Sequence, residues 1–281
     1  MIKKLQNAVA RMIAGVETHT RLAQRARYED LRDRKQREQP RTLSASGYKI
    51  FSQSDEDGMI AEIFRRIGTT NKRFVEFGVG DGLENNTLAL LYQGWTGLWI
   101  DGSDEFCRTI TAAYDKAIAS GQLALINSFI TRDNIDVLIT SRIEAGEIDL
   151  LSVDIDGNDA HVYRAIKSIS PRVIVFEYNA KFGPEIDYCM AYDAVHMWRK
   201  SDRFGASLKH YETLLDGKGY RLVGCNLVGT NAFFVRDDLI GDKFDGPFTA
   251  AEHFEPARYE LAGIPSGHPP IHATFATRVG G

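Results

Sequence analysis

The stretch RFVEFGVGDGLENNT, residues 73–87, decides the fold. Apolar residues in RFVEFGV form the pattern of a buried β-strand, and Gly78, Gly80 and Gly82 follow it. Glycines allow the backbone to turn sharply and to approach a ligand without a Cβ clash. In an open α/β sheet, ligands bind outside the carboxyl ends of the strands. The stretch therefore predicts a nucleotide-like ligand at this turn.

The charges around the glycine turn select among the cofactors that use such a turn. A dinucleotide site has the pattern G-x-G-x-x-G and a helix N-terminus aimed at a pyrophosphate. Here the third glycine comes one residue early, and Leu83 occupies the place of that glycine. Glu76, Asp81 and Glu84 would repel a pyrophosphate but attract a sulfonium and an ammonium group. The pattern favours S-adenosylmethionine over NAD.

Two later strand ends supply further candidate cofactor-binding residues. Asp101 ends the strand GLWID, where a carboxylate can accept hydrogen bonds from ribose hydroxyls. Ser128 and Phe129 end the next strand, where the edge and face of an adenine would lie. A phenylalanine at that position is also typical of a core residue, so the adenine role of Phe129 has a packing alternative.

Strand and helix patterns alternate from residue 54 onward. Apolar strand candidates occupy residues 73–79, 97–102, 123–130, 148–156 and 172–179, with helical segments between them. This alternation predicts an α/β fold with a doubly wound, Rossmann-like sheet that is mostly parallel. Two further strands, YRLVGCN and TNAFFVRDDL, predict a C-terminal antiparallel hairpin.

Composition changes divide the chain into three parts. We expect a helical, amphipathic and charged extension over residues 1–45, a main domain over 46–245 with a loop-rich insertion near 180–205, and an irregular proline-rich tail over 246–281. Apolar residues recur at spacings of three and four on one face of the extension. They are Ile2, Leu5, Val9, Met12, Ile13 and Val16. A solvated helix, a homo-oligomer contact and adhesion to an anionic membrane surface remain open for this segment.

Overall composition excludes several functional classes. The net charge of −4 and pI near 6.0 argue against a nucleic-acid-binding protein, which needs a basic face. Three separated cysteines support neither a disulfide framework nor a zinc site. There is no apolar run long enough for a transmembrane helix, and Arg11 interrupts the only stretch similar to a signal peptide. We expect a cytoplasmic protein, with peripheral membrane contact left open.

Several segments resemble one enzyme family. The segment VEFGVGDG, the downstream Asp101 and the closing hairpin resemble class I S-adenosylmethionine-dependent methyltransferases over residues 50–240. The segment SVDIDGNDAHVYRAI is similar to the K-I-D-V-E-G-x-E segment of FkbM-like O-methyltransferases, with Ser152 in place of the lysine. SQSDEDGMIAEIF and VIVFEYNAKFGPE also resemble methyltransferases associated with surface-polysaccharide genes. The resemblance implies S-adenosylmethionine as cofactor and a sugar or glycan hydroxyl as acceptor.

Acidic residues at two strand ends are candidates for the chemistry. Methyl transfer requires alignment of the acceptor oxygen and removal of its proton. Asp154 and Asp156 are two residues apart, so they point the same way from one strand end, and Glu177 and Asn179 repeat this spacing on the next strand. Converging carboxylates need protons or a cation to neutralise them. Asp156 and His161 are the candidate catalytic bases.

The carboxylates also resemble a metal site. Mg-dependent macrocin-type sugar O-methyltransferases place acidic ligands after the fourth and fifth strands. By that resemblance Asp154 and Glu177 would bind Mg²⁺, with Asn179 as a weaker third ligand. Without a metal, Asp154 would hydrogen-bond the amino group of the cofactor.

Other functions remain as alternatives. The acceptor can be another small hydroxylated metabolite, or the chain can be a non-catalytic scaffold that retains the fold and uses its N-terminus for assembly. Trp198, in the insertion, is a candidate for stacking on a sugar face. An NAD-dependent oxidoreductase is disfavoured by Leu83 and the acidic glycine turn.

Overall fold

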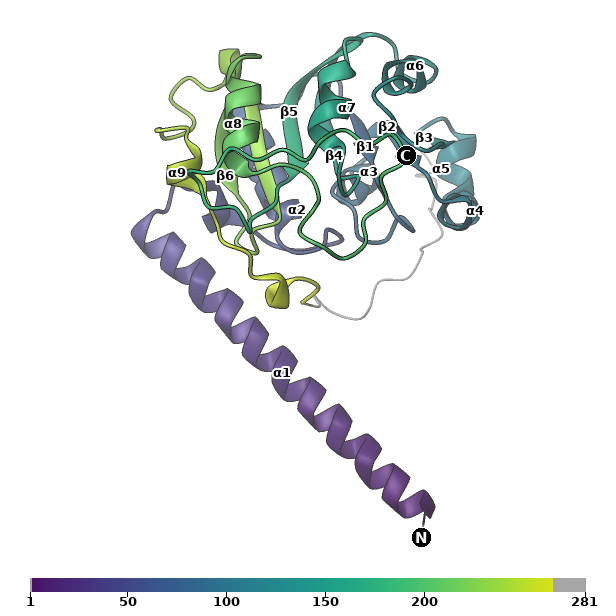
Figure 1. Cartoon of the computed structure of the whole chain (residues 1–281), viewed down its shortest axis with the longest axis vertical. Helices are drawn as coiled ribbons and strands as arrows, with labels where there is room; N and C mark the ends of the chain where they lie inside the picture. Colours follow the sequence, from purple (N-terminus) through teal and green to yellow (C-terminus); the bar gives the residue numbers. More distant parts are fainter. Residues whose placement is uncertain (1, 265–281) are drawn as a thin grey trace, which may run out of the picture.

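A mixed β-sheet forms the centre of the protein (Figure 1). The computed structural model describes residues 2–264. Within this range the sheet has seven strands in the order β3-β2-β1-β4-β5-β7-β6. The first five strands run parallel, and β7 is antiparallel to both of its neighbours, β5 and β6. The predicted doubly wound sheet with a C-terminal antiparallel hairpin is confirmed. The strands are β1 (Arg73–Phe77), β2 (Thr96–Asp101), β3 (Leu123–Asn127), β4 (Gly146–Val153), β5 (Ile169–Glu177), β6 (Tyr220–Cys225) and β7 (Asn231–Arg236).

Helices cover both faces of the sheet. Helices α2 to α5 pack on one face, and α6 to α8 pack on the other. Among the described helices, none combines the length and the apolar run that crossing a membrane requires. The helices are α1 (Ile2–Glu38), α2 (Glu56–Ile67), α3 (Leu88–Tyr92), α4 (Asp104–Ala113), α5 (Asp115–Ala119), α6 (Ile135–Thr140), α7 (Asp159–Ala165), α8 (Leu208–Asp216) and α9 (Ala250–His253), with short 3₁₀ turns η1 (Leu43–Ser46), η2 (Asp237–Leu239) and η3 (Tyr259–Leu261).

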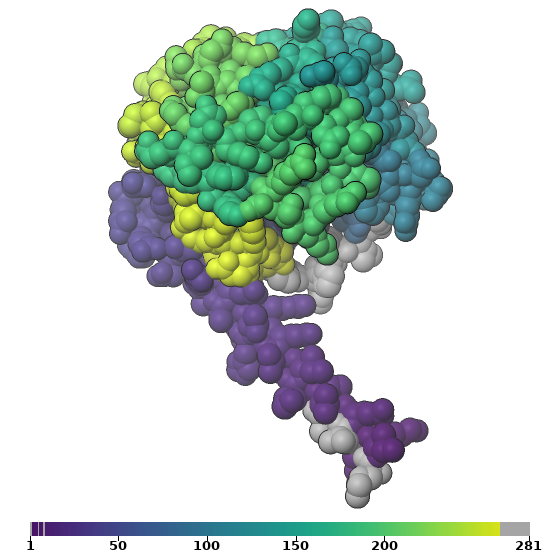
Figure 2. All heavy atoms as spheres, in the orientation of Figure 1, coloured from purple at the N-terminus to yellow at the C-terminus, as the bar shows by residue number. Residues whose placement is uncertain are grey.

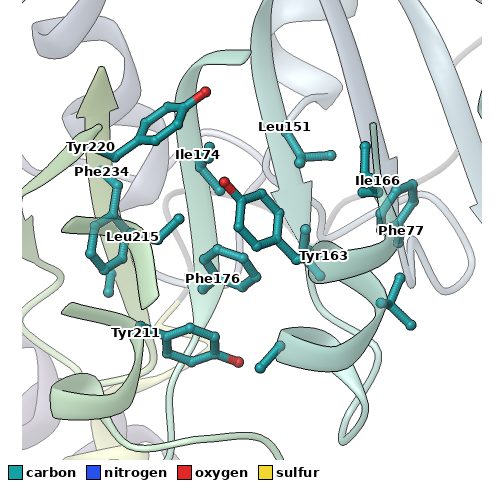
Figure 3. Close-up of a cluster of buried hydrophobic side chains, with 14 of the residues drawn as sticks. Phe77, Leu151, Tyr163, Ile166, Ile174, Phe176, Tyr211, Leu215, Tyr220 and Phe234 are labelled. Atoms are coloured by element: carbon teal, nitrogen blue, oxygen red, sulfur yellow. The ribbon is translucent and has the colours of Figure 1, made fainter. Parts of the chain in front are cut away.

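Two apolar cores form because the strands alternate their side chains between the two faces. Phe176, at the centre of one core, stacks on Tyr211 of α8 with ring centroids 4.4 Å apart and meets Tyr163 of α7 edge-on (Figure 3). The neighbouring Val175 points into the opposite core, with Trp99. Burial on both faces explains why the strands read as nearly continuous apolar runs.

Two segments differ in detail from the sequence prediction. The helical segment expected between the second and third strands is divided into α4 and α5 at Tyr114. The Tyr114 hydroxyl donates to the carbonyl oxygen of Gly82 at 2.8 Å, so this side chain supports the glycine turn from below. In the tail, α9 and η3 interrupt the expected coil, while residues 265–281 lie outside the described residues.

A buried ion pair joins the central strands to the end of α2. Asp149 on β4 is fully buried and accepts hydrogen bonds from the backbone N–H groups of residues 70–72. Arg172 on β5 donates to Asp149 at 2.6 Å and to the Ile67 and Gly68 carbonyl oxygens, at 3.0 and 2.8 Å. Its guanidinium therefore satisfies the last carbonyl groups of α2 as well as the carboxylate.

Replacing Arg172 should destabilise the fold strongly. Arg172→Met leaves the Asp149 charge buried without its cation, so we expect a loss of about 3 kcal/mol in the free energy of unfolding, measured by urea denaturation. Arg221, which makes exposed ion pairs with Asp216 and Asp237, provides the control. Arg221→Met should cost no more than about 1 kcal/mol. Equal losses in both variants would contradict a dominant role for the buried pair.

A second buried polar network fixes the start of α2 against the turn between β6 and β7. The Asn226 amide donates to Ser54 Oγ and Glu56 Oε1, at 3.0 and 2.8 Å. Asp55 accepts from the Leu227 backbone N–H at 3.3 Å. Burial, and then the neighbouring Glu56 carboxylate, raises the pKa of Asp55 to about 7. The folded protein therefore favours the protonated form of this carboxyl.

The raised pKa of Asp55 predicts a pH-dependent stability. Its folded pKa lies above the unfolded value, so its contribution is fully present below about pH 4 and is lost as pH rises through about 7. Asp55→Asn should remove this component and flatten the fall of the unfolding free energy over that interval by at most about 1.4 kcal/mol per pH unit. The exposed Asp242 gives the control, since Asp242→Asn should keep the wild-type slope. An unchanged slope in Asp55→Asn would refute the assignment.

Candidate functional site

A cleft of about 890 Å³ opens at the carboxyl ends of the central strands. Its wall combines the glycine turn after β1, the ends of β2, β4 and β5, the insertion after β5, and η3. This volume lies within the range of known small-molecule sites. The position is the one at which an open α/β sheet binds its ligands.

The three glycines of the turn have different roles. Gly78 has a φ of +72°, and a Cβ there would lie 1.6 Å from the carbonyl oxygen of Asp154, so the end of β4 packs directly on this position. Gly80 lines the cleft with a φ of +57°, and nothing described lies within 4 Å of where its Cβ would be. Gly82 lies beneath the turn against Trp99 and Tyr114. Gly80 is thus the glycine whose backbone a ligand can approach.

Asp101 holds the glycine turn in place at the edge of the cleft. Its carboxylate accepts hydrogen bonds from the backbone N–H groups of Gly80 and Ser103, at 2.9 and 2.8 Å. The side chain lines the cleft, and burial raises its pKa. Each carboxylate oxygen can accept more than one hydrogen bond, so Asp101 can still accept from ligand hydroxyls.

Glu76 lies in the interior below the turn and is not part of the cleft wall. Its carboxylate accepts from the Asn85 amide, from the backbone N–H groups of Asn86 and Thr87, and from the Thr87 hydroxyl. The structure therefore gives this predicted cofactor-binding residue a different position: it orders the loop that follows the glycine turn.

The position of Glu76 also bears on which cofactor fits. A dinucleotide site offers the free N–H groups of a helix N-terminus to a pyrophosphate. Here the N–H groups of Asn86 and Thr87, just before α3, are bound to the Glu76 carboxylate. Asp81 and Glu84 line the cleft beside the turn, and Lys49 pairs with Glu84 at 3.2 Å. The site is better suited to a cationic ligand group than to a pyrophosphate.

Three carboxylates converge on the opposite side of the cleft. Oxygen atoms of Asp154, Asp156 and Glu177 all lie within 4.8 Å of one another. They meet because β4 and β5 are adjacent and in register, with Val153 beside Phe176. Burial, and then the negative charges of the cluster, raises the pKa of Asp154 and of Glu177 well above their usual values. The cluster therefore has a high affinity for protons or for a cation.

The loop between β4 and α7 presents Asp156 to the cleft in a constrained conformation. Asp156 has a φ of +55°, a region that residues other than glycine rarely adopt. The buried Asp159 carboxylate accepts from the backbone N–H groups of Ile155 and Gly157, at 2.9 and 2.8 Å, and so holds the loop closed around Asp156. Backbone strain of this kind is concentrated at functional sites.

Two of the predicted chemical residues lie away from the cluster. The buried Asn179 amide donates to the carbonyl oxygens of Asp202 and Phe204, and its oxygen accepts from the Lys181 N–H. His161 bonds the Met190 carbonyl oxygen through Nε2 at 2.8 Å. Neither lines the cleft. In the structure Asp156, rather than Asn179, lies beside Asp154 and Glu177, and Asn179 bonds the backbone of the insertion.

Aromatic side chains form the rim of the cleft. Phe129 lines the wall and is 47% exposed, whereas Ser128 is absent from the wall and bonds the Phe129 carbonyl oxygen. Phe106, from the first turn of α4, is 41% exposed and lines the same wall. Trp198 from the insertion lines the cleft and is 45% exposed.

Sequence reasoning did not identify several residues of this wall. The His196 ring packs on Gly157, where a Cβ would lie 2.3 Å from it, and its Nε2 lies 3.2 Å from the Asp156 carbonyl oxygen. Phe106 and Tyr259 were also missed. Phe106 could have been found from the sequence, because it lies in the first helical turn after the strand that ends at Asp101. His196 and Tyr259 could not, because the insertion and the tail in which they lie have no periodic pattern.

Comparisons with known proteins found distant structural likenesses. No protein-family model and no curated protein matches the chain. Similar solved structures include the N-terminal domain of EvdMO1 with SAH bound, which is 14% identical, has a TM-score of 0.43 and covers 74% of this chain and 94% of its own. A putative caffeoyl-CoA O-methyltransferase from Staphylococcus aureus is 10% identical, with a TM-score of 0.43 and coverages of 63% and 81%. A putative O-methyltransferase from Klebsiella pneumoniae is 12% identical, with a TM-score of 0.40 and coverages of 63% and 78%.

These likenesses are limited to the fold. The sheet itself is the mostly parallel, Rossmann-like sheet with a C-terminal antiparallel pair of strands that the sequence predicted. The activity, the cofactor and the substrate are argued below from the geometry of the cleft.

Replacing Asp101 should weaken cofactor binding. We expect wild-type protein to bind S-adenosylhomocysteine in a calorimetric titration and to show no affinity for NAD. Asp101→Ala removes a charged hydrogen-bond acceptor and loosens the Gly80 turn, so the dissociation constant should rise roughly 10- to 150-fold. Asp115→Ala, at an exposed position outside the cleft, should bind as wild type does. Tight NAD binding, or an Asp101→Ala affinity equal to wild type, would contradict this assignment.

Proposed function

We propose that the protein is an S-adenosylmethionine-dependent O-methyltransferase that acts on a sugar hydroxyl in glycan or polysaccharide biosynthesis. The observation that carries the proposal is the pairing of two features in one cleft. A glycine turn fixed by Asp101 lies on one side, and the cluster of Asp154, Asp156 and Glu177 lies across from it. The first suits the cofactor, and the second suits the activation of a hydroxyl.

The cleft residues fit the parts of S-adenosylmethionine. Asp101 would accept hydrogen bonds from the ribose hydroxyls, and the open position at Gly80 leaves room for the ligand at the turn. Phe106 and Phe129 offer exposed apolar rings for the adenine. The acidic wall, with Asp81 nearby, would favour the positive sulfonium and ammonium groups. When bound, the cofactor supplies an electrophilic methyl group.

The carboxylate cluster supports proton removal from the acceptor. A sugar hydroxyl is a weak acid, so its oxygen needs a base at hydrogen-bond distance when it attacks. Asp156 is the most exposed member of the cluster, and burial raises its pKa, which makes it a stronger base than an ordinary aspartate. Asp154 and Glu177 lie deeper, and their raised pKa values, with a side-chain hydrogen bond between them, favour a proton shared by these two carboxyls. We therefore assign the base to Asp156.

The same three carboxylates would fit a divalent cation. Mg²⁺ prefers oxygen ligands and commonly binds through a few carboxylates together with water. Asp154, Asp156 and Glu177 would hold it, and the cation would neutralise the cluster and lower the pKa of an acceptor hydroxyl. Asn179, bound to the insertion backbone, would not take part.

The acceptor assignment rests on the family resemblance and on the rim of the cleft. Trp198 lines the cleft with a partly exposed ring, and its Nε1 donates to the Ser201 carbonyl oxygen at 2.8 Å, which fixes the indole. A fixed aromatic plane near hydrogen-bonding carboxylates suits a sugar ring, which has apolar faces and polar edges.

The three free cysteines agree with a reducing, cytoplasmic location.

Methyl transfer to a panel of sugars and nucleotide sugars tests the proposal. Wild-type protein should transfer a labelled methyl group from S-adenosylmethionine. Asp156→Asn should keep S-adenosylhomocysteine affinity within a few-fold but reduce turnover by about 10²- to 10⁴-fold. Asp133→Asn, an exposed change outside the cleft, should leave both unchanged. Treatment with EDTA and then Mg²⁺ distinguishes a cation-bound cluster from a protonated one. Turnover that is lost with EDTA and recovered with Mg²⁺ indicates a bound cation, and unchanged turnover indicates the protonated cluster.

Two results would overturn the proposal. Failure to bind S-adenosylhomocysteine under any condition would favour a scaffold protein with a retained fold. Full turnover by Asp156→Asn would exclude this residue as the base.

A further inference from the structure

The first half of α1 projects from the rest of the protein (Figures 1 and 2). Among the described residues, the hydrogen bonds and ion pairs between α1 and the main domain begin at Gln24, which donates to the Glu260 carbonyl oxygen at 2.7 Å. Arg27 pairs with Glu260 at 3.0 Å, and Lys35 pairs with Glu255 at 2.8 Å. Residues 2–22 make no hydrogen bond or ion pair with the main domain among the described residues, and we call them the projecting segment.

The projecting segment carries an exposed apolar stripe. At 100° per residue, the large apolar side chains from Ile2 to Val16 fall within an arc of about 100° on one side of the helix, whereas Leu22 lies outside this arc. The stripe residues whose side chains are described are between 42% and 74% exposed: Ile2, Val9, Met12, Ile13 and Val16. A contiguous exposed stripe of this kind in a folded protein indicates a surface that binds something apolar.

Basic side chains lie on the polar side of the helix, away from this stripe. Lys3 and Arg21 lie about 80° beyond one edge of the stripe, and Lys4 and Arg11 lie about 80–100° beyond the other edge, all of them exposed. Glu17 is the acidic residue of the projecting segment, so the segment is net positive in a chain whose net charge is −4. The charge of the projecting segment is therefore opposite in sign to that of the whole protein.

The pattern suits a lipid surface better than a second copy of the helix. The apolar residues from Ile2 to Val16 follow a heptad spacing for about two heptads, and the next position in the pattern holds the polar His19. A coiled coil is indicated only when the spacing continues for three or four heptads. In a coiled coil, charged residues beside the apolar stripe pair between the two helices. Here the positions beside the stripe, such as Gln6 and Gly15, hold no opposite charges that could pair between two copies. An apolar stripe on one face, with lysines and arginines on the polar face, matches a helix that lies at a membrane interface.

We propose that the projecting segment lies along the surface of an anionic lipid bilayer, with its apolar stripe in the headgroup region and its long lysine and arginine side chains reaching back to the lipid phosphates. The segment does not cross the membrane, which agrees with the lack of a spanning helix in the described residues. The proposal is independent of the methyltransferase assignment. Because α1 binds η3, and Tyr259 of η3 lines the cleft, a bound helix would also hold the cleft close to the membrane.

Sedimentation of the full-length protein with lipid vesicles tests the proposal. Wild-type protein should bind vesicles of equal parts phosphatidylglycerol and phosphatidylcholine, and should bind pure phosphatidylcholine at least 10-fold more weakly. High salt should weaken binding to the anionic vesicles, because it screens the basic side chains.

Two double variants that introduce only uncharged glutamines distinguish loss of the apolar stripe from a general change in the helix. The double variant Val9→Gln with Ile13→Gln should weaken binding to anionic vesicles at least 10-fold. The control, Ala14→Gln with Thr18→Gln, alters the opposite side of the same helix and should bind within about 3-fold of wild type. Lys4→Gln with Arg11→Gln should weaken binding to anionic vesicles at least 10-fold and leave binding to neutral vesicles unchanged.

Three outcomes would overturn the proposal. One is a wild-type protein that does not sediment with anionic vesicles. Another is an equal loss in the stripe variant and its control. The third is a wild-type dimer on light scattering that becomes monomeric in the Val9→Gln, Ile13→Gln variant without any vesicle binding, which would identify a second copy as the partner. Methyltransferase activity in solution is a separate readout, so failure here leaves the proposed reaction unaffected.

Discussion

The buried carboxylate of Glu76 is the constraint on which the cleft depends. Burial raises its pKa, and hydrogen bonds from Asn85, Asn86 and Thr87 offset this cost by stabilising its charged form. Trp99 of β2 extends the network by donating to the Thr87 hydroxyl at 2.8 Å. The loop after the glycine turn is thereby tied to two strands, and the turn itself stays open toward the cleft.

Close packing then joins the two halves of the site. Gly78 donates its N–H to Ile100 on β2 at 3.0 Å, while its α-carbon lies against the Asp154 carbonyl at the end of β4. Because a side chain at Gly78 would collide with Asp154, the glycine sets how near the cofactor side can come to the carboxylate side. The distance over which a methyl group would move is thus fixed by backbone contacts between strands.

The sequence predicted those parts of the site that follow regular strands. Asp154 and Glu177 come together because each directly follows a strand, and the two strands are neighbours in register. The two-residue spacing along a strand also predicted that Asn179 would point the same way as Glu177. It does not apply there, because β5 ends at Glu177 and the chain then turns toward the insertion. The position of His161 could not be predicted for a related reason: its partner, the Met190 carbonyl, belongs to the insertion, which has no periodic pattern to reveal the contact.

The irregular segments therefore carry the specific part of the function. A glycine turn with a carboxylate on the next strand serves many acceptors equally well, so it cannot select one. Trp198 and His196 of the insertion and Tyr259 of η3 line the cleft, and in the proposed reaction they would contact the acceptor. Helix α1 also binds η3 through Glu260. If α1 lies on a lipid surface as we propose, η3 would place this part of the cleft wall near that surface.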